Sequence, residues 1–190
     1  MNNKTDLRIL KTYEKLKLAF GAMMNETTFD DITVFDLCAR AGIRRATFYK
    51  HFTDKYAFLS HIVKALQKEI NANVERRFNL GQPVEYFTLY VKEIIAYFES
   101  RDVILDNILK SATFSVIYSI ITNSTYESLV EHISATSKAG IKLPTDISIT
   151  ASFINGGLTY LLLNWFKTKD ITKEELLAKI MRLLINFFKN

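Results

Sequence analysis

A glycine between two short segments of helical period is the feature that most limits the fold of this chain. Thr33 precedes an apolar run, so its hydroxyl can accept a hydrogen bond from a free amide of the first helical turn, while Asp36 favours the positive helix end. Gly42 suits the left-handed position at which helices end. A helical period resumes at Ala46 after a brief turn. The pattern predicts a helix-turn-helix.

Most of the remaining chain also has a helical period. Only two prolines and six glycines interrupt its 190 residues, and 48% of the residues are hydrophobic, which is enough for a buried core. Apolar residues from Leu7 to Phe20 predict one helix, and a further helix continues from Val63 to about Phe78. Residues 84–98 carry two apolar stripes and therefore need cover on both sides. The sequence thus predicts an all-α protein.

The positive charge lies in the first part of the chain. The formal net charge is +5, and the whole excess falls within residues 1–77, where 14 Lys and Arg face 9 Asp and Glu. Five of these cations are closely spaced: Arg40, Arg44, Arg45, Lys50 and Lys55. Such asymmetry is typical of a protein in which one part meets a polyanion. A solvated, charged helix face is the alternative interpretation.

The side chains of residues 42–52, GIRRATFYKHF, divide into one face of the predicted helix that points inward and one that points outward. Phe48 and Phe52 lie four positions apart and are expected to anchor the second helix of the motif. The outward positions are then Arg45, Thr47, Tyr49, Lys50 and His51. This face is cationic and rich in hydrogen-bond donors, which suits the phosphate walls and base edges of a DNA major groove.

Further matches extend over residues 32–63. They are Thr33 at a helix start, Ala-Gly-Ile at 41–43, Thr-Phe-Tyr-Lys-His-Phe at 47–52, and Lys55 followed by Phe58-Leu59. This set resembles the DNA-binding motif of the tetracycline-repressor (TetR/AcrR) family of bacterial transcriptional regulators. The resemblance implies that phosphates are held by Thr33, Tyr49, His51 and Lys55. The resemblance also implies that the residues nearest the base edges are Arg45, Thr47 and Lys50.

Arg44 departs from the family pattern, which commonly has Ser at the start of the recognition helix. The loss of a side-chain N-cap costs about 1 kcal/mol, and Arg44 is expected to reach a phosphate when DNA is bound. On the same assignments, Lys55→Ala should weaken binding to all DNA sequences and flatten its salt dependence by about one unit.

The two C-terminal helices carry more apolar surface than one protomer needs. The first starts after Pro144, with Thr145 or Asp146 as its N-cap, and the second opens with a capping box at 172–175. The second helix has one stripe of Leu177, Ile180, Met181, Leu184 and Phe188 and another of Leu176, Leu183 and Phe187. One stripe can enter the core of the protomer and the other needs a partner, which predicts a four-helix bundle between two protomers, in agreement with the homodimer on an inverted repeat that the resemblance implies. Burial of both stripes within one chain is the alternative.

Aromatic and polar side chains alternate in the middle helices, a composition typical of small-molecule sites between helices. The candidates for an effector pocket are Tyr90, Tyr97, Phe114, Tyr118, Phe153, Asn155 and Trp165. Ordinary core packing explains the same residues. The resemblance implies a repressor that a small ligand releases from DNA, without identifying the ligand. The alternative is a DNA-binding protein without an effector, whose C-terminal part only dimerises or recruits a protein partner.

Other functional classes find little support. The three histidines lack metal-ligand spacing, no GxSxG motif occurs, and Cys38 has no partner for a disulfide or a CxxC pair, so we expect no catalytic residue, metal or cofactor. The chain has no run of 18 uncharged apolar residues and no signal-peptide pattern, and no membrane role is expected.

The sequence as a whole predicts a cytoplasmic, homodimeric transcription regulator rather than an enzyme. Residues 1–65 are expected to form a three-helix DNA-binding domain that contains the helix-turn-helix. A long helix would join it to a helical regulatory and dimerisation domain at residues 66–190. The partners expected are double-stranded DNA, a second copy of the chain and an unidentified small-molecule effector, and the expected activity is ligand-responsive repression.

Overall fold

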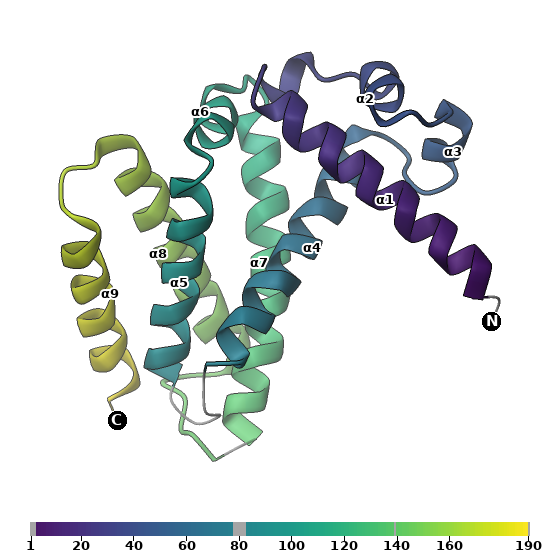
Figure 1. Cartoon of the computed structure of the whole chain (residues 1–190). Coiled ribbons are helices and arrows are strands. Elements are labelled where there is room, and N and C mark those ends of the chain that lie inside the picture. Colours follow the sequence, from purple (N-terminus) through teal and green to yellow (C-terminus); the bar gives the residue numbers. More distant parts are fainter. Residues whose placement is uncertain (1–2, 78–82, 139, 190) are drawn as a thin grey trace. The chain divides into compact units, whose positions relative to one another are not determined.

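The computed structural model describes residues 3–77, 83–138 and 140–189. Every regular element in these ranges is helical (Figure 1), which confirms the predicted all-α class. In chain order the elements are α1 (Asn3–Met24), the short 3-10 helix η1 (Phe29–Asp31), α2 (Val34–Ala41), α3 (Arg45–Tyr49), α4 (Lys55–Glu75), α5 (Pro83–Glu99), α6 (Asp102–Lys110), α7 (Phe114–Lys138), α8 (Ile147–Thr168) and α9 (Lys173–Phe188).

The chain divides into two compact units, and two of the dividing points lie within α4 and α7. Unit 1 comprises Met1–Val63 and Arg101–Ile120, and unit 2 comprises Lys64–Ser100 and Ile121–Asn190. The boundary expected at residue 65 lies close to the first dividing point. The assignment of all of 66–190 to one domain differs from the structure, because α6 and the start of α7 pack within unit 1.

Phenylalanine rings fill the centre of unit 1. Phe58 on α4 meets Phe20 on α1 edge-on, with ring centroids 5.5 Å apart, and lies 5.1 Å from Phe52. Phe48 on α3 is fully buried, and Phe52 is buried as well. Such ring pairs add a specific geometry to the burial of apolar area. The predicted inward anchors of the second motif helix are therefore confirmed.

The apolar face of α1 is buried only along its second half. Leu16 and Phe20 lie in the core of unit 1, whereas Leu7 and Leu10 are exposed. The helix predicted over Leu7 to Phe20 is confirmed as part of α1, and its apolar face is buried at Leu16 and Phe20 but not at Leu7 and Leu10. Apolar side chains are buried only where another element covers them, and helical period alone does not show how far that cover extends.

Asp30 connects η1 to the start of α7. Its carboxylate accepts hydrogen bonds from the backbone amides of Ala112 and Thr113, at 2.7 and 3.1 Å, and from the Thr113 hydroxyl at 2.7 Å. Led by the Thr113 hydroxyl, these bonds lower the pKa of Asp30 to about 2. Asn107 on α6 also donates to the Met24 carbonyl at 2.8 Å. These bonds give the physical reason why residues 101–120 belong to unit 1.

Asp30→Asn should make unfolding less sensitive to acid. The pKa of Asp30 in the fold lies below its ordinary value of 3.8, so the carboxylate stabilises the fold above about pH 4 and loses this contribution as the pH falls toward 2. Urea unfolding followed by circular dichroism should show the variant less stable than wild type at pH 6, with a much smaller difference near pH 2. Asp106→Asn, at an exposed ion pair on α6, is the matched control. A difference as large at pH 2 as at pH 6 would contradict this role.

The core of unit 2 is built around α5, and both apolar stripes of this helix are covered, as predicted. Phe87, Val91 and Ile95 are fully buried, and Tyr86 and Tyr90 on the other stripe are buried as well. Helix α9, yellow in Figure 1, runs alongside α5. Pro83 opens α5, where its fixed φ and missing amide are tolerated.

Helix α9 buries one row of apolar side chains and leaves others exposed. Leu176, Ile180 and Leu184 are buried, whereas Met181 and Leu183 are exposed. The predicted grouping differs at two positions, because Leu176 joins the buried row with Ile180 and Leu184, while Met181 lies outside it. The buried residues follow an i, i+4 spacing. Apolar side chains cover a wide arc of α9, and only those that face neighbouring helices such as α5 are buried.

The capping predictions in unit 2 are confirmed. The Asp146 carboxylate accepts a hydrogen bond from the amide of Ile149 at 3.0 Å and caps α8. Thr172 and Glu175 form the reciprocal capping box of α9. A cap side chain accepts a hydrogen bond from a backbone amide only two or three residues further along the chain, so caps can be recognised from the local sequence.

Within unit 2, α4 is fastened to α7 and α5 by polar side chains. The Gln67 amide contacts the hydroxyls of Ser124 and Thr125 on α7. The Asn71 amide donates to Ser128 at 2.6 Å and accepts from the Tyr86 hydroxyl at 3.2 Å. Asn71 therefore joins three helices through directional bonds.

No single helix in the described ranges is long and apolar enough to cross a membrane. Helices α6 and α7 pass such a test only as a pair, and they are bent by 118° where they meet.

Candidate DNA-binding surface

The predicted helix-turn-helix is present in α2 and α3. Thr33 caps α2 by accepting a hydrogen bond from the Asp36 amide at 3.1 Å. Gly42 follows α2 with φ +63°, in the left-handed region that favours glycine. Helix α3 has only five residues, Arg45–Tyr49. It is therefore shorter than the predicted helical segment.

Most of the predicted outward residues are accessible. Exposed side chains on α3 and its flanks are Arg44, Arg45, Tyr49 and Lys50, and half-buried ones are Thr47 and His51. Arg44 occupies the N-cap of α3 without a side-chain capping bond, as expected from the absence of Ser there. The structure thus places these six residues on and next to the second motif helix, as the prediction requires, while their DNA contacts stay a prediction.

His51 is oriented by α1. Its Nδ1 atom lies 3.4 Å from the Tyr13 hydroxyl, within hydrogen-bond distance, and the two rings meet edge-on with centroids 5.3 Å apart. Contact at Nδ1 leaves Nε2 as the atom that can face a phosphate. Tyr13 is a supporting residue that the sequence did not reveal, because it lies 38 positions away.

Two of the residues predicted to contact phosphates, Lys55 and Thr33, already use their side-chain donors in hydrogen bonds within the protein. The Lys55 ammonium donates to the carbonyls of Phe29, Asp30 and Ile32 at 2.9, 2.9 and 3.0 Å, which uses all three of its N–H donors. The Thr33 hydroxyl donates to the Asp36 carboxylate at 2.5 Å. In this conformation Lys55 holds η1 and the entry to α2 together, which is a structural role, and its phosphate contact stays a prediction.

The cationic surface is smaller than the sequence suggests. Arg40 forms a two-pronged ion pair with Glu26, so its charge is compensated locally. Partial burial of Lys55 lowers the pKa of its ammonium, although nearby acids oppose this effect. Of the five closely spaced cations, Arg44, Arg45 and Lys50 remain exposed for a polyanion.

Phe35 is an exposed residue of this surface that was not among the predicted DNA contacts. This residue lies on α2 beside the cap and is 60% exposed, and the Arg45 guanidinium carbon stands 5.5 Å from its ring centroid. The outward position of Phe35 could have been found from the helical period of α2. Leu37, Cys38 and Ala41 form the buried face of α2, which leaves position 35 outward.

The seven effector-pocket candidates are distributed over both units. Phe114 and Tyr118 belong to unit 1, while the other five belong to unit 2. Tyr90 lies in the core, and burial raises its pKa to about 12. Tyr97 is half-buried on α5, and Phe153 on α8 is 66% exposed.

Asn155 and Trp165 have structural partners. The Asn155 amide donates to the Thr122 carbonyl on α7 at 3.0 Å. The Trp165 indole donates to the Ile171 carbonyl at 2.8 Å, and the Lys169 ammonium lies 3.5 Å from the centre of its ring. These bonds satisfy buried polar groups, so the alternative of ordinary core packing accounts for both residues.

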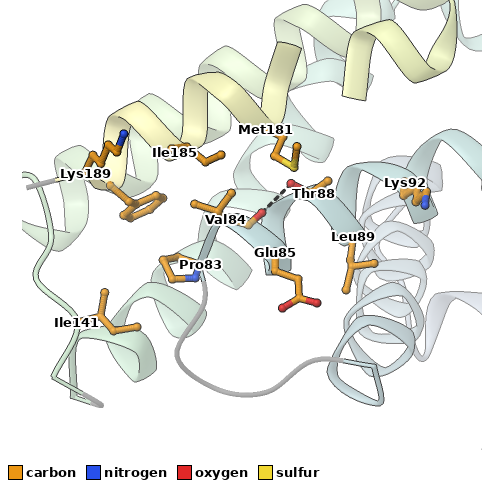
Figure 2. A pocket seen from close by; sticks show the side chains of 11 residues that line it. Pro83, Val84, Glu85, Thr88, Leu89, Lys92, Ile141, Met181, Ile185 and Lys189 are labelled. Carbon is orange, nitrogen blue, oxygen red and sulfur yellow. Dashed lines mark hydrogen bonds between the residues drawn. The ribbon is translucent and has the colours of Figure 1, made fainter. Parts of the chain in front are cut away.

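A groove in unit 2 lies between α5 and α9 and has a volume of about 580 Å³ (Figure 2). Its walls are mainly apolar, with Val84 on α5 facing Met181, Ile185 and Phe188 on α9. The polar lining includes Glu85, Thr88, Lys92 and Lys189. None of the seven predicted pocket residues lines this groove. Within the described residues, no group of His, Cys, Asp and Glu could hold a metal ion.

The helix-turn-helix matches a known family model. Residues 22–62 match the model of bacterial regulatory proteins of the tetR family. A 66-residue segment is 33% identical to the HTH-type transcriptional regulator YxbF of Bacillus subtilis (strain 168), and this segment spans 34% of the chain and 17% of that relative's length.

Solved structures extend the likeness to nearly the whole chain. A TetR-family transcriptional regulator from Syntrophomonas wolfei str. Goettingen matches with a TM-score of 0.69 at 17% identity, over 94% of this chain and 95% of that one. The complex of SmeT with triclosan matches with a TM-score of 0.61 at 17% identity, over 92% and 90% of the two chains. At such identities the likeness shows a shared fold.

Proposed function

We propose that this chain is a TetR-family transcriptional regulator that binds DNA, and that it acts as a dimeric repressor on an inverted-repeat operator; the match of residues 22–62 to the tetR family model and the shared fold support this. The observation that carries the proposal is the exposed cationic face of α3. Arg45 stands at the first position of this helix, and Lys50 follows its end. The first residues of a recognition helix are those that contact base edges in helix-turn-helix proteins.

The dimer is supported by an uncovered apolar face on α8 and α9. Ile149, Phe153 and Tyr160 are exposed along α8, and Leu183 is exposed on α9. Phe153 stacks on Phe187 of α9 with ring centroids 5.1 Å apart. A contiguous apolar face of this kind indicates an interface, and the same face on a second copy can cover it about a two-fold axis.

Gly156 and Gly157 lie exposed on the same helix, between Phe153 and Tyr160. A Cβ atom added at either glycine would meet nothing within 4 Å in the described parts of the chain. Their lack of a side chain is therefore not required by packing within the protomer. It suits the close approach of a helix from a partner.

A binding selection on random duplex DNA tests this proposal. We expect it to enrich an inverted repeat with half-sites separated by about one helical turn, or 34–36 Å, because each protomer offers one recognition helix. Arg45→Ala should abolish the enrichment. If wild-type protein of verified fold enriches no sequence, then the cationic face is only a charged helix surface or a non-specific binder.

Lys50→Ala should change base preference at particular operator positions. Lys50 is exposed at the end of α3 and is assigned to base edges, where a lost contact changes discrimination by about 1–3 kcal/mol. Affinities for operators mutated one base pair at a time provide the measurement. Thr47→Ala is the companion variant, and Lys138→Ala on α7 is a control outside this surface. Uniform weakening across all sequences would instead assign Lys50 to phosphates.

We also propose that a small molecule regulates DNA binding through the groove between α5 and α9. Its volume and apolar walls fit a small-molecule site. The groove has a physical route to α4, since Tyr86 lies on α5 next to the groove residue Glu85 and donates to Asn71 on α4. The triclosan complex of a protein with the same fold gives general support for ligand binding.

Filling the groove tests this regulatory site. Ile185→Trp should leave operator binding near the wild-type level and abolish release by any compound that a library screen identifies on wild-type protein. Arg182→Trp on an exposed face of α9, outside the groove and the proposed dimer face, is the matched control and should keep the response. Release that survives in Ile185→Trp would place the effector elsewhere. If no compound releases wild-type protein, the alternative of a dimerising protein without an effector is favoured.

We propose a non-enzymatic role in the cytoplasm, where operator DNA is accessible. The proposal rests on the family and on the DNA-binding domain.

A further inference from the structure

An exposed phenylalanine lies on the DNA-binding surface. Phe35 on α2 is 60% exposed, although three neighbouring apolar positions of the same helix, Leu37, Cys38 and Ala41, are buried. Leaving a phenyl ring largely in water forgoes the favourable burial of its apolar area. The ring therefore contributes little to packing within the protomer, and a bound partner could cover it.

Arg45 shares the surface with this ring. The guanidinium carbon lies 5.5 Å from the ring centroid, within the range of a cation–π contact. Arg45 is exposed at the first position of α3. This contact places the guanidinium beside the ring, so the apolar ring and the cationic fork are presented together.

This pair has the chemistry to read a thymine beside a guanine. Base edges in the major groove include one prominent apolar group, the C5 methyl of thymine, and phenylalanine is among the side chains that contact it. An arginine fork suits the O6 and N7 acceptors of guanine. A stacked ring and fork are thus matched to adjacent base pairs.

We propose that Phe35 is a specificity-determining residue that recognises a thymine methyl in each half-site and holds Arg45 toward the neighbouring base pair. This inference rests on the proposed function, since it requires sequence-specific DNA binding. It adds α2 to the reading surface, which the predicted base contacts confined to α3.

Replacement of thymine by deoxyuridine in the selected operator is the direct test, because it removes only the methyl group. Each thymine is replaced in turn, symmetrically in both half-sites, and affinity is measured by fluorescence anisotropy. For wild-type protein we expect one position at which the loss is about fourfold per half-site, as for one methyl group that returns to water. Phe35→Ala should bind the thymine and deoxyuridine operators equally at this position.

Two further variants separate the roles of the ring. Phe35→Leu keeps an apolar contact but removes the aromatic face, so it should retain part of the methyl dependence and lose preference at the base pair that Arg45 contacts. Leu18→Ala removes an exposed apolar side chain from α1 and should leave the methyl dependence unchanged. Thermal unfolding of each variant checks that the fold persists, which we expect because both positions are exposed.

The outcomes distinguish this inference from the proposed function. An enriched operator that is insensitive to deoxyuridine at every thymine would overturn the role of Phe35 and leave sequence-specific binding intact. Sensitivity that persists unchanged in Phe35→Ala would assign the methyl contact to another residue. Failure to enrich any operator would overturn both proposals.

Discussion

Lys55→Ala should lower the free energy of unfolding by about 3 kcal/mol and should leave the salt dependence of DNA binding by the folded protein nearly unchanged. The ammonium donates to three main-chain carbonyls, at 2.9 to 3.0 Å, and lies 4.7 Å from the centre of the Phe29 ring. Its removal leaves three acceptors at the entry to α2 without their donor. Lys55 is only half-buried, so water can reach part of the site and partly replace the lost donor.

Urea unfolding and salt titrations of operator binding measure the two halves of this prediction. Lys15→Ala is the matched control, because Lys15 is an exposed cation of unit 1 outside the predicted DNA contacts. It should change stability by less than about 0.5 kcal/mol. A flattening of about one unit in the slope for Lys55→Ala, without a loss of stability, would restore the phosphate contact that the family resemblance implies.

Phe153→Glu should convert the dimer into a monomer and weaken operator binding by about 100-fold or more. Phe153 is 66% exposed on α8 and stacks on Phe187 of α9, at the centre of the uncovered apolar face. A carboxylate there would be buried without a partner in the dimer. Each protomer would then bind one half-site independently and lose the effective concentration that a linked pair provides.

Sedimentation equilibrium and operator titrations, both carried out at several protein concentrations, provide the measurement. Val103→Glu introduces the same charge at an exposed apolar position on α6 and should leave the oligomeric state unchanged. Circular dichroism should show both variants folded, because neither side chain belongs to the core. A Phe153→Glu protein that remains dimeric would exclude this face as the interface.

Local features of the fold could be predicted because their causes are local. Thr33 and Gly42 bound α2 through contacts within a few residues, and the caps at Asp146 and Thr172 act in the same way. The inward anchors of α3 follow from helical period, because neighbouring positions on one face are buried together. The outward positions of α3 follow from the same period.

The roles of charged residues could not be predicted, because they depend on partners that are distant in sequence. Lys55 meets carbonyls 23 to 26 positions earlier, and Arg40 pairs with Glu26. Similarly, α6 joins unit 1 through Asn107, whose partner carbonyl lies 83 positions away. No period or cap in the sequence marks such contacts.

By itself the sequence determined the all-α class, the helix-turn-helix and its cationic outward face. These follow from caps, turns and periodicity, in which neighbouring residues act on one another. Only the tertiary structure decided which cations remain free for DNA, which row of α9 is buried, and which apolar side chains stay uncovered. The physical reason is that burial and charge pairing depend on which side chains the fold brings within a few ångströms, and many apolar or charged positions would satisfy the same local pattern.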